Sequence, residues 1–216
     1  MRILFVVDHP YTLASAENVP HRRSFTAAVA AAAVRGARRA GHDADVIDLT
    51  ADEFSPVMSR ADLVAWRMAE VVDPLVADYQ RRLREADHVV FAFPIWWEAM
   101  PAATKGFLDR VLTKGIVFDE ISDAAGIPFR NKLTGLRGVT LLTIMTTPHA
   151  VYRWWFGSPA TKIIFKGTFG KIGVKNLSWR NYASVTEKTP QQRQNMITQT
   201  EQHFAALRDV RSLQSR

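Results

Sequence analysis

Residues 85–118 read EADHVVFAFPIWWEAMPAATKGFLDRVLTKGIVF, and the succession of patterns in this stretch decides the fold class. Residues 88–93 form a short apolar run bounded by charge on one side and by Pro94 on the other, which is typical of a strand buried on both faces of a parallel sheet. Pro101 can open a helix as its first residue. Beyond it, apolar residues recur on one helical face: Phe107, Leu108, Val111 and Leu112. A buried strand followed directly by an amphipathic helix predicts an α/β fold.

The connection between this strand and this helix carries large apolar side chains: Ile95, Trp96, Trp97 and Met100. Two adjacent indoles are costly to expose, and in an open α/β sheet ligands bind beyond the carboxyl ends of the strands. A flat aromatic ligand is therefore expected at this place. The alternative is that both tryptophans pack against the edge of the sheet, because large aromatic side chains more often form cores than ligand platforms.

Two segments resemble a known family. FPIWWEAMPAATKGFLDRV at residues 93–111 resembles the flavin-contacting signature F/Y-P-x-x-W-W/F-x-x-x-P-A-x-x-K-G-W/F-x-D/E-R-V of the flavodoxin-like NAD(P)H:quinone oxidoreductases and matches it nearly throughout. EFSPVMSRADL at residues 53–63 resembles the F-x-P-x-x-S-R-x-D segment that follows the second strand in the same family. The resemblance extends over residues 1 to about 205.

The resemblance implies a homodimeric flavoprotein that passes a hydride from NAD(P)H through the flavin to a quinone or a related aromatic acceptor by a ping-pong mechanism. FAD is favoured over FMN, because the match at residues 53–63 belongs to the FAD-binding branch of the family. Residues 50–73 pack across the subunit interface in the family. The cofactor contacts that the resemblance implies are His9, Ser24, Phe25, Pro94, Ile95, Trp96, Trp97, Thr146 and Thr147.

A tyrosine and a histidine beyond the Thr-Thr turn stabilise the reduced flavin in this family. Tyr152 stands close to the expected place of the tyrosine, while His149 precedes it instead of following it. We therefore hypothesise that Tyr152, aided by His149, donates to the reduced flavin, and the alternative is that Tyr152 only packs among aromatic side chains. Pro148 and His149 replace two family glycines, and Pro148 removes one backbone donor beside Thr147.

The start of the chain predicts a second contribution to the same site. Residues 3–7 are an apolar strand, and after a loop of about fourteen residues Ser24 is a plausible N-cap for a helix that runs to about Arg39. The free amides and the positive dipole end of such a helix favour a phosphate, and capping and phosphate binding are compatible. Residues 21–23 are His-Arg-Arg; they either clamp a pyrophosphate or are solvated loop charges.

The remaining pattern completes an alternation of strands and helices. We expect strands at residues 43–49, 139–145 and 176–185 and helices at residues 74–84 and 190–207. Residues 50–73 are expected to form a surface excursion that is weakly helical around residues 63–71, and residues 118–137 to form a loop. Residues 151–165 are expected to form a helix or helical turn that carries aromatic side chains towards the mouth of the pocket. A membrane-surface role for these aromatics beside Arg153 and Lys162 is the alternative.

This alternation predicts one domain over residues 1–216 with a flavodoxin-like, doubly wound, five-stranded parallel sheet in the order 2-1-3-4-5 and helices on both faces. In this order the topological switch point lies between the first and third strands. The loops that follow residues 7 and 93 then flank one crevice, where a ligand is expected.

Composition narrows the function classes. The chain has 216 residues with 47% hydrophobic content and no cysteine, which suffices for a sizeable core and excludes disulfides, thiolate metal sites and thiol catalysis. We expect a cytoplasmic protein, because neither a signal peptide nor an apolar run long enough for an integral membrane segment is present. A net charge of +7 indicates first a solvated basic surface, then attraction of phosphorylated cofactors, and least of all nucleic acid.

Other functions find less support in the residues. The six histidines lack the spacing of zinc or iron ligands, so no metal site is expected. The nucleophile motif G-x-S-x-G of hydrolases is absent. A nitro- or azo-reductase of the same fold remains the nearest alternative, and a flavodoxin-like electron carrier or a regulatory subunit of a transport system is the alternative from another class. The basic charge disfavours a carrier, which usually has an acidic docking face.

Overall fold

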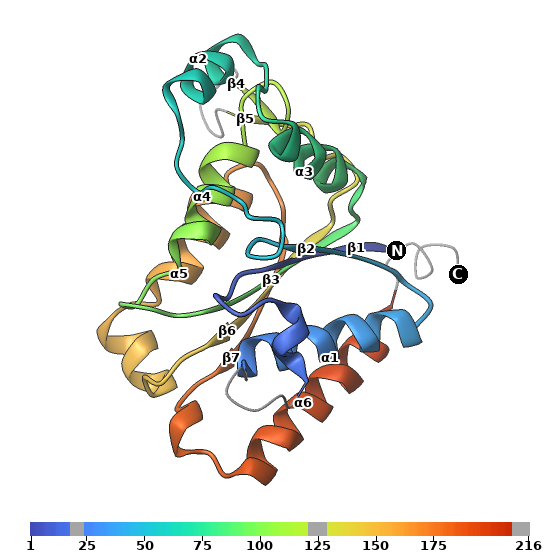
Figure 1. Cartoon of the computed structure of the whole chain (residues 1–216), viewed down its shortest axis with the longest axis vertical. Helices are drawn as coiled ribbons and strands as arrows, with labels where there is room; N and C mark the ends of the chain where they lie inside the picture. Colours follow the sequence, from blue (N-terminus) through green and yellow to red (C-terminus); the bar gives the residue numbers. More distant parts are fainter. Residues whose placement is uncertain (18–23, 121–128, 209–216) are drawn as a thin grey trace.

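The protein was analysed as a computed structural model, which describes residues 1–17, 24–120 and 129–208. Its centre is a parallel sheet of five strands in the order β2-β1-β3-β6-β7 (Figure 1), which confirms the predicted order 2-1-3-4-5. The bounds are β1 (Arg2–Val7), β2 (Asp43–Asp48), β3 (His88–Pro94), β6 (Gly138–Ile144) and β7 (Asn176–Tyr182). Every residue of β3 and β6 is buried, as expected for the central strands of a parallel sheet covered on both faces.

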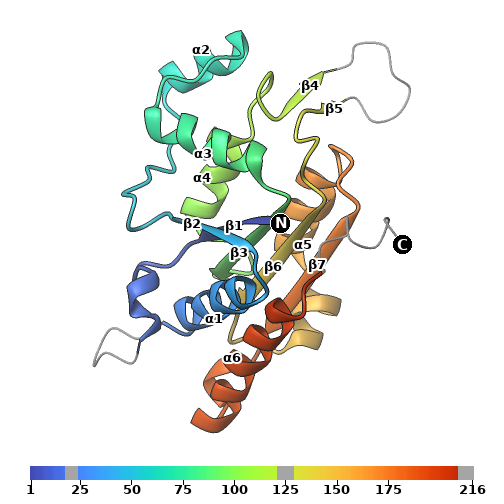
Figure 2. The same cartoon turned by 90° about the vertical axis from the view of Figure 1, so that its right-hand side faces the viewer.

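Helices cover the two faces of this sheet. α1 (Phe25–Arg39) and α6 (Pro190–Ala205) lie on one face, while α3 (Pro74–Glu85) and α4 (Ala102–Val111) lie on the other (Figures 1 and 2). Successive strand residues point to opposite faces of the sheet and belong to two separate hydrophobic cores. Leu4 lies in the core on the α3–α4 side and Phe5 in the core on the α1–α6 side. Gly36 lets α1 and α6 approach closely, because a Cβ at this position would lie 2.2 Å from the carbonyl oxygen of Glu201. None of the helices in the described ranges is long and apolar enough to cross a bilayer.

The first helices confirm the local signals read from the sequence. α1 has Ser24 as its N-cap, and α3 begins at Pro74 as predicted. Within the surface excursion, α2 (Arg60–Met68) starts earlier than the expected weak helix, because Ser59 and Asp62 form a capping box. α2 stands away from the body of the sheet (Figure 1).

Two sequence-based expectations about element type and position were wrong. Residues 118–137 are not all loop: β4 (Phe118–Glu120) and β5 (Phe129–Asn131) form an antiparallel pair. The pair is held by the rings of Phe118 and Phe129, whose centroids are 4.9 Å apart, and strands of three residues are too short to show a period. Pro101 is the N-cap of α4 and not its first helical residue.

The aromatic stretch after β6 folds into short pieces. Residues Val151–Trp155 and Lys162–Phe169 each form wide π-type helical turns, and α5 (Pro159–Thr161) lies between them. Gly157 and Ser158 both adopt a positive φ, which breaks the helical path after Phe156. The predicted helical character is therefore confirmed, but as separate turns.

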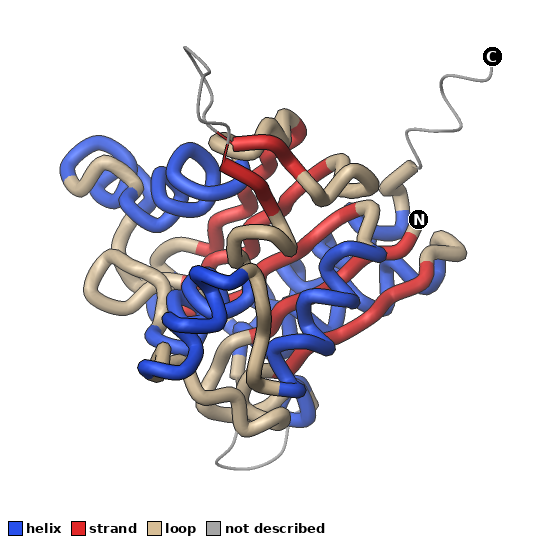
Figure 3. The backbone as a smooth tube through the Cα atoms, turned by 90° about the horizontal axis from the view of Figure 1, so that it is seen from above, coloured by secondary structure: helices blue, strands red, loops and turns tan. Residues whose placement is uncertain are grey.

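Parallel strands bring their carboxyl ends to one edge. The register pairs Val7 of β1 with Ala92 of β3, and Pro94 of β3 with Ile144 of β6. The view from above in Figure 3 shows the strands side by side, with loops at their ends. The loops that follow β1, β3 and β6 therefore share this carboxyl edge, where the sequence analysis expects a ligand.

Candidate functional site

Asp8, the residue that follows β1, is buried under the carboxyl edge. Its carboxylate accepts hydrogen bonds from the backbone N–H of Thr104 at 2.7 Å and from the Thr104 hydroxyl at 2.6 Å. Burial raises the pKa of Asp8, although both hydrogen bonds from Thr104 act to lower it. The N-cap of α4, Pro101, makes no side-chain capping bond. Asp8 therefore caps α4 from the neighbouring strand and joins β1 to the helix that follows β3.

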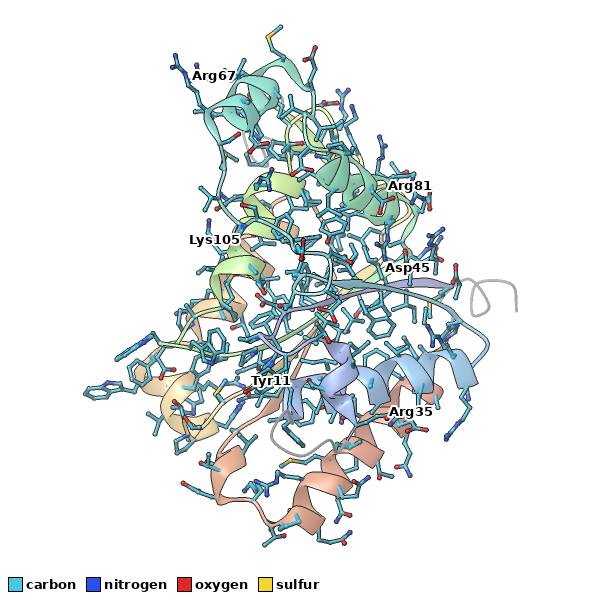
Figure 4. All side chains as sticks on the ribbon, viewed as in Figure 1. Tyr11, Arg35, Asp45, Arg67, Arg81 and Lys105 are labelled. Carbon is cyan, nitrogen blue, oxygen red and sulfur yellow. The ribbon has the colours of Figure 1, made fainter. Side chains whose placement is uncertain are left out.

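His9 lies at the start of the next loop, is half-buried, and contacts Tyr11, which Figure 4 labels. Its Nδ1 is 3.0 Å from the backbone nitrogen and 3.3 Å from the carbonyl oxygen of Tyr11, and the two rings are tilted at a centroid distance of 5.5 Å. Partial burial lowers the pKa of His9. Nε2 makes no hydrogen bond with a described residue, so it is the ring nitrogen available to a ligand.

Ser24 fixes the start of α1. Its buried hydroxyl accepts the N–H of Ala27 at 3.0 Å. No described residue accepts from the N–H groups of Phe25 and Thr26, so two donors at the positive end of the helix are open. The ring of Phe25 packs edge-on against Tyr182 at 6.1 Å. This arrangement suits an anion such as a phosphate at the start of α1.

The connection after β3 is a tight reversal. The N–H of Ile95 still pairs with the carbonyl of Ile144 at 2.7 Å, while Trp96 and Ala99 exchange two backbone hydrogen bonds of 3.0 Å each. Between them Trp97 and Glu98 have φ values of 49° and 61°. Two consecutive left-handed residues define the mirror-image turn that usually requires Asn-Gly. Such strain in residues other than glycine concentrates at functional sites.

The reversal presents its indoles to solvent. Trp96 is 45% exposed and Trp97 is 100% exposed. The alternative in which both tryptophans pack against the sheet edge of the same chain therefore does not describe this protein. Pro94 beneath them is buried as the last residue of β3. The turn holds a flat apolar surface outward, at the edge where a ring system would bind.

Glu98 connects this turn to the loop that follows β6. The Thr147 hydroxyl donates to Oε1 of Glu98 at 3.0 Å, and the Tyr152 hydroxyl donates to the Glu98 carbonyl oxygen at 3.2 Å. Oε2 of Glu98 is buried and has no partner among the described residues. Thr146, next to Thr147, is exposed. A buried carboxylate oxygen without a donor suits a ligand that brings an N–H or O–H group.

Tyr152 and His149 both pack against Trp179. Tyr152 is fully buried, its hydroxyl also accepts the N–H of Ala160 at 3.2 Å, and burial raises its pKa to about 12. His149 is exposed, its Nδ1 is 2.9 Å from the amide nitrogen of Asn181, and its ring centroid is 5.1 Å from that of Trp179. The ring centroids of Tyr152 and Trp179 are 6.0 Å apart. The tyrosine is thus protonated at neutral pH and already bonded within the protein.

The structure therefore joins some of the predicted site residues and separates others. The Trp96–Trp97 turn, Thr147 and Tyr152 meet through Glu98, whereas His9 and Ser24 belong to the loop on the β1 side. Residues 21–23, for which a pyrophosphate clamp was considered, lie outside the described residues. Among the described residues no group of three or more His, Asp or Glu side chains is placed to hold a metal ion.

Three residues at this edge were missed by the sequence analysis. Glu98 could have been identified from the sequence, because it is a carboxylate at the position where the family signature has a second aromatic residue. Asp8 could also have been identified, since a charged residue directly after a buried strand requires a partner. Asn181 could not, because its contact with His149 depends on the packing of β7 beside β6.

A hollow elsewhere on the molecule does not coincide with these loops. It measures about 260 Å³ and lies between α4, the β4–β5 pair and the helical turn Lys162–Phe169. Its lining includes Leu108, Phe118 and Phe129. None of the predicted site residues lines it, so the candidate site at the carboxyl edge is identified from its hydrogen-bonding groups and not from this hollow.

Known proteins share this fold. The NAD(P)H:quinone oxidoreductase of Methanothermobacter marburgensis superposes with a TM-score of 0.79 at 20% identity, over 96% of this chain and 99% of that one. An FMN-dependent NADH-azoreductase of Bacillus anthracis, solved in complex with FMN, gives a TM-score of 0.74 at 14% identity, over 97% of this chain and 100% of that one. At these identities the likeness shows the fold alone.

Sequence similarity to a characterised enzyme is local. The chain is 32% identical to NAD(P)H dehydrogenase (quinone) 1 of Rattus norvegicus over 130 residues, which are 52% of this chain and 47% of that enzyme. The alignment thus spans about half the length of the relative. Over residues 1–204 the chain matches a family described by its flavodoxin-like fold. Because this match takes in nearly the whole chain, the protein belongs to that flavodoxin-like family.

Proposed function

We propose that this protein is a flavin-dependent NAD(P)H:quinone oxidoreductase. Its flavodoxin-like family and its local identity to NAD(P)H dehydrogenase (quinone) 1 support the proposal. A bound flavin supplies the redox chemistry, since it accepts a hydride from NAD(P)H and returns two electrons to a quinone. Both substrates use the same face of the site in turn, which gives ping-pong kinetics.

The observation that carries the proposal is the set of open groups along the carboxyl edge. Two backbone donors at Phe25 and Thr26 match a phosphate, and the free oxygen Oε2 of Glu98 matches an N–H donor of a heterocycle. The exposed indoles of Trp96 and Trp97, on the loop after β3, match a flat ring. A flavin nucleotide combines these three chemistries in one molecule.

The chain's own residues then bind the flavin and orient its ring system. The start of α1, with Ser24 and Phe25, holds the phosphate, and His9 contacts the flavin through Nε2 at the neighbouring loop. The remaining residues form the ring site, with backbone or side-chain contacts: Pro94, Ile95, Trp96, Trp97, Thr146 and Thr147. Since Glu98 is tied to Thr147 and Tyr152, movement of the indole turn is coupled to the loop after β6.

We further propose FAD as the flavin, on the resemblance of residues 53–63 to the FAD-binding branch, together with a cytoplasmic homodimer. A partner subunit would cover the apolar side chains that α2 exposes, among which Val64 is 57% and Met68 is 66% accessible. Nucleic acid has no part in the proposed function. The acceptor is a quinone, and a panel of quinones, nitroaromatics and azo dyes separates this activity from the azo-reductase alternative of the same fold.

The absorbance spectrum of the purified protein tests the proposal directly. We expect a yellow protein whose released cofactor has the mass of FAD, and a steady-state rate of NAD(P)H oxidation that requires a quinone. Parallel lines in double-reciprocal plots would identify the ping-pong order. A colourless preparation that takes up neither added FAD nor added FMN would overturn the proposal.

Tyr152 is proposed as the donor that stabilises charge on the reduced flavin, aided by His149. This role requires the hydroxyl to leave the Glu98 carbonyl when the ring binds, because its single proton is donated there in the structure. Losing such a donor costs roughly 100-fold in rate. In stopped-flow reduction by NAD(P)H, Tyr152→Phe should be slower by this factor, and an unchanged rate would assign Tyr152 to packing alone. His149→Asn tests the assisting ring in the same experiment.

A further inference from the structure

One long segment of the chain carries charge of a single sign. Residues 124–186 contain nine Lys and Arg and no Asp or Glu, although the whole chain has a net charge of only +7. The segment includes the aromatic turns between β6 and β7. Net positive charge is therefore concentrated in this segment, which includes the loop after β6, because the acidic residues lie elsewhere in the sequence.

The turn Val151–Trp155 and the residue after it expose large aromatic side chains. Trp154 is 78%, Trp155 is 84% and Phe156 is 46% accessible. Tyr152 in the same turn is fully buried and anchors the backbone through its two hydrogen bonds. The exposed rings are thus held outward by a fixed turn, and their exposure is a property of the fold.

One cationic group lies directly beside these rings, and two more follow on the next helical turn. The guanidinium of Arg153 is 5.2 Å from the ring centroid of Trp154. The ammonium of Lys162 lies over Gly157, where a Cβ would approach it to 2.9 Å. Arg153, Lys162 and Lys166 are all exposed, and no carboxylate in the described part of the chain pairs with them. We call this set, together with Trp154, Trp155 and Phe156, the aromatic-basic face.

The aromatic-basic face adjoins the proposed flavin site. Tyr152, at its base, donates to the carbonyl of Glu98, whose neighbour Trp97 is wholly exposed. Figure 1 shows the connection after β3 and the 151–157 segment at the same side of the molecule. A surface that covered this face would therefore also lie beside the mouth of the site.

We propose that the aromatic-basic face docks on the surface of an anionic lipid membrane. Tryptophan and phenylalanine partition into the interfacial layer of a bilayer, where an indole keeps its polar N–H among the headgroups. Basic side chains on the same short helical elements add attraction to anionic lipids. This interaction goes beyond the proposed redox function and does not depend on it.

The distribution of charge disfavours a second copy as the occupant of this face. A two-fold symmetric interface places a patch against itself, so the unpaired cations would face one another across the contact. Like charges in such a contact oppose association. An anionic partner neutralises them, and a bilayer also takes up several aromatic side chains that lie on one surface.

Vesicle binding of the full chain tests the proposal. The probes are vesicles of equal parts phosphatidylglycerol and phosphatidylcholine, compared with vesicles of phosphatidylcholine alone. Sedimentation should recover the protein with the anionic vesicles, tryptophan emission should shift to shorter wavelength, and raised ionic strength should weaken both effects. Absence of sedimentation with anionic vesicles at low ionic strength would overturn the proposal.

Two variants of the face separate its aromatic and basic contributions. The double variant Trp154→Ser with Trp155→Ser should bind anionic vesicles about tenfold more weakly or less well still. The triple variant of Arg153, Lys162 and Lys166 to Gln should lose roughly fivefold for each basic side chain, or about 100-fold in all. Thermal melting confirms that each variant is folded, since all of these side chains are exposed.

The matched control for the basic side chains lies outside residues 50–73, which we propose for the dimer contact. Arg38→Gln with Arg84→Gln removes two exposed cations that form no ion pair within the described part of the chain. This control should bind vesicles as the parent does, and an equal loss per cation in face and control variants would overturn the proposal. Should the Trp154 and Trp155 variant instead change the oligomer mass measured in solution while vesicle binding stays unchanged, a second copy occupies the face and the proposal fails.

Discussion

The two edges of the sheet differ in how they treat a partly buried carboxylate. The amino edge surrounds Asp45 with ion pairs, although Nε of Arg2 has no hydrogen-bond partner among the described residues. Arg82 donates two hydrogen bonds to the carboxylate of Asp45, from Nε at 3.0 Å and from Nη2 at 2.5 Å. Arg2 forms ion pairs with Asp45 and with Glu85. Burial alone would raise the pKa of Asp45, but the hydrogen bonds and charges of Arg82 and Arg2 outweigh it and lower the pKa. Figure 4 labels Asp45 at this edge, far from Tyr11.

At the carboxyl edge the protein leaves groups open. Oε2 of Glu98 and the N–H groups of Phe25 and Thr26 have no partner among the described residues, and Trp97 is wholly exposed. Buried polar groups are nearly always paired in native proteins. The unpaired groups at the carboxyl edge are therefore those that we propose to contact the flavin.

The largest change in stability is expected from protonation of His88, the first residue of β3 at the amino edge of the sheet. Burial lowers its pKa from 6.5 to about 4, and its Nε2 is 2.8 Å from the Thr140 hydroxyl. The folded pKa is the lower one, so stability is complete above pH 6.5 and is lost as the pH falls towards 4. Over this window we expect a loss of about 3 kcal/mol in the free energy of unfolding, measured by urea titration at each pH.

The matched variant for this prediction is His88→Gln, which keeps a polar group beside Thr140 and does not titrate. Its free energy of unfolding should change much less between these two pH values. If the parent and His88→Gln decline in parallel, the pH dependence originates in other groups.

The second prediction concerns Asp8, whose carboxylate accepts two hydrogen bonds from Thr104 at the carboxyl edge. Asp8→Ala removes the acceptor of both Thr104 bonds and leaves the start of α4 without a cap, which should cost about 2 kcal/mol. Asp8→Asn keeps an acceptor and removes the charge whose burial is costly, so it should cost much less. Thermal melting compares the two variants, and equal losses would show that charge, and not an acceptor, is required at this position.

The third effect sharpens the comparison between two N-caps. Ser24→Ala at α1 and Thr189→Ala at α6 each remove a side-chain cap and should each cost about 1 kcal/mol in the free energy of unfolding. Only Ser24→Ala should also weaken flavin binding, because only α1 begins at the proposed site. Fluorescence titration with FAD measures this difference, and equal affinities in the two variants would remove the start of α1 from the site.

The smallest effect on stability is expected at the indole turn. Replacing Trp96 and Trp97 with alanine should change the free energy of unfolding by less than about 0.5 kcal/mol, because exposed side chains contribute little to folding. The same double variant should release the flavin. A folded variant that keeps stoichiometric flavin would show that the indoles do not hold it, and a variant that unfolds would contradict the small contribution to stability expected from exposed side chains.

Much of the architecture was determined by the sequence itself. Strand and helix periods, the proline after residue 93 and the Ser24 cap are local signals, and alternation of these elements leaves few topologies to choose from. The signature at residues 93–111 also marked the indole turn, because two adjacent tryptophans are visible without any fold. The β4–β5 pair was not predictable, since three-residue strands depend on the Phe118–Phe129 contact across a loop.

Tertiary structure decided which groups remain free. The sequence singled out Tyr152 as a donor to a ligand, but only the packing of the loop after β6 against the turn after β3 bonds its hydroxyl to Glu98. The same packing isolates one oxygen of Glu98 and brings Asp8 to the start of α4. Hydrogen bonds between residues about 50 to 100 positions apart arise only when the sheet has assembled, because no local pattern encodes which strand ends become neighbours.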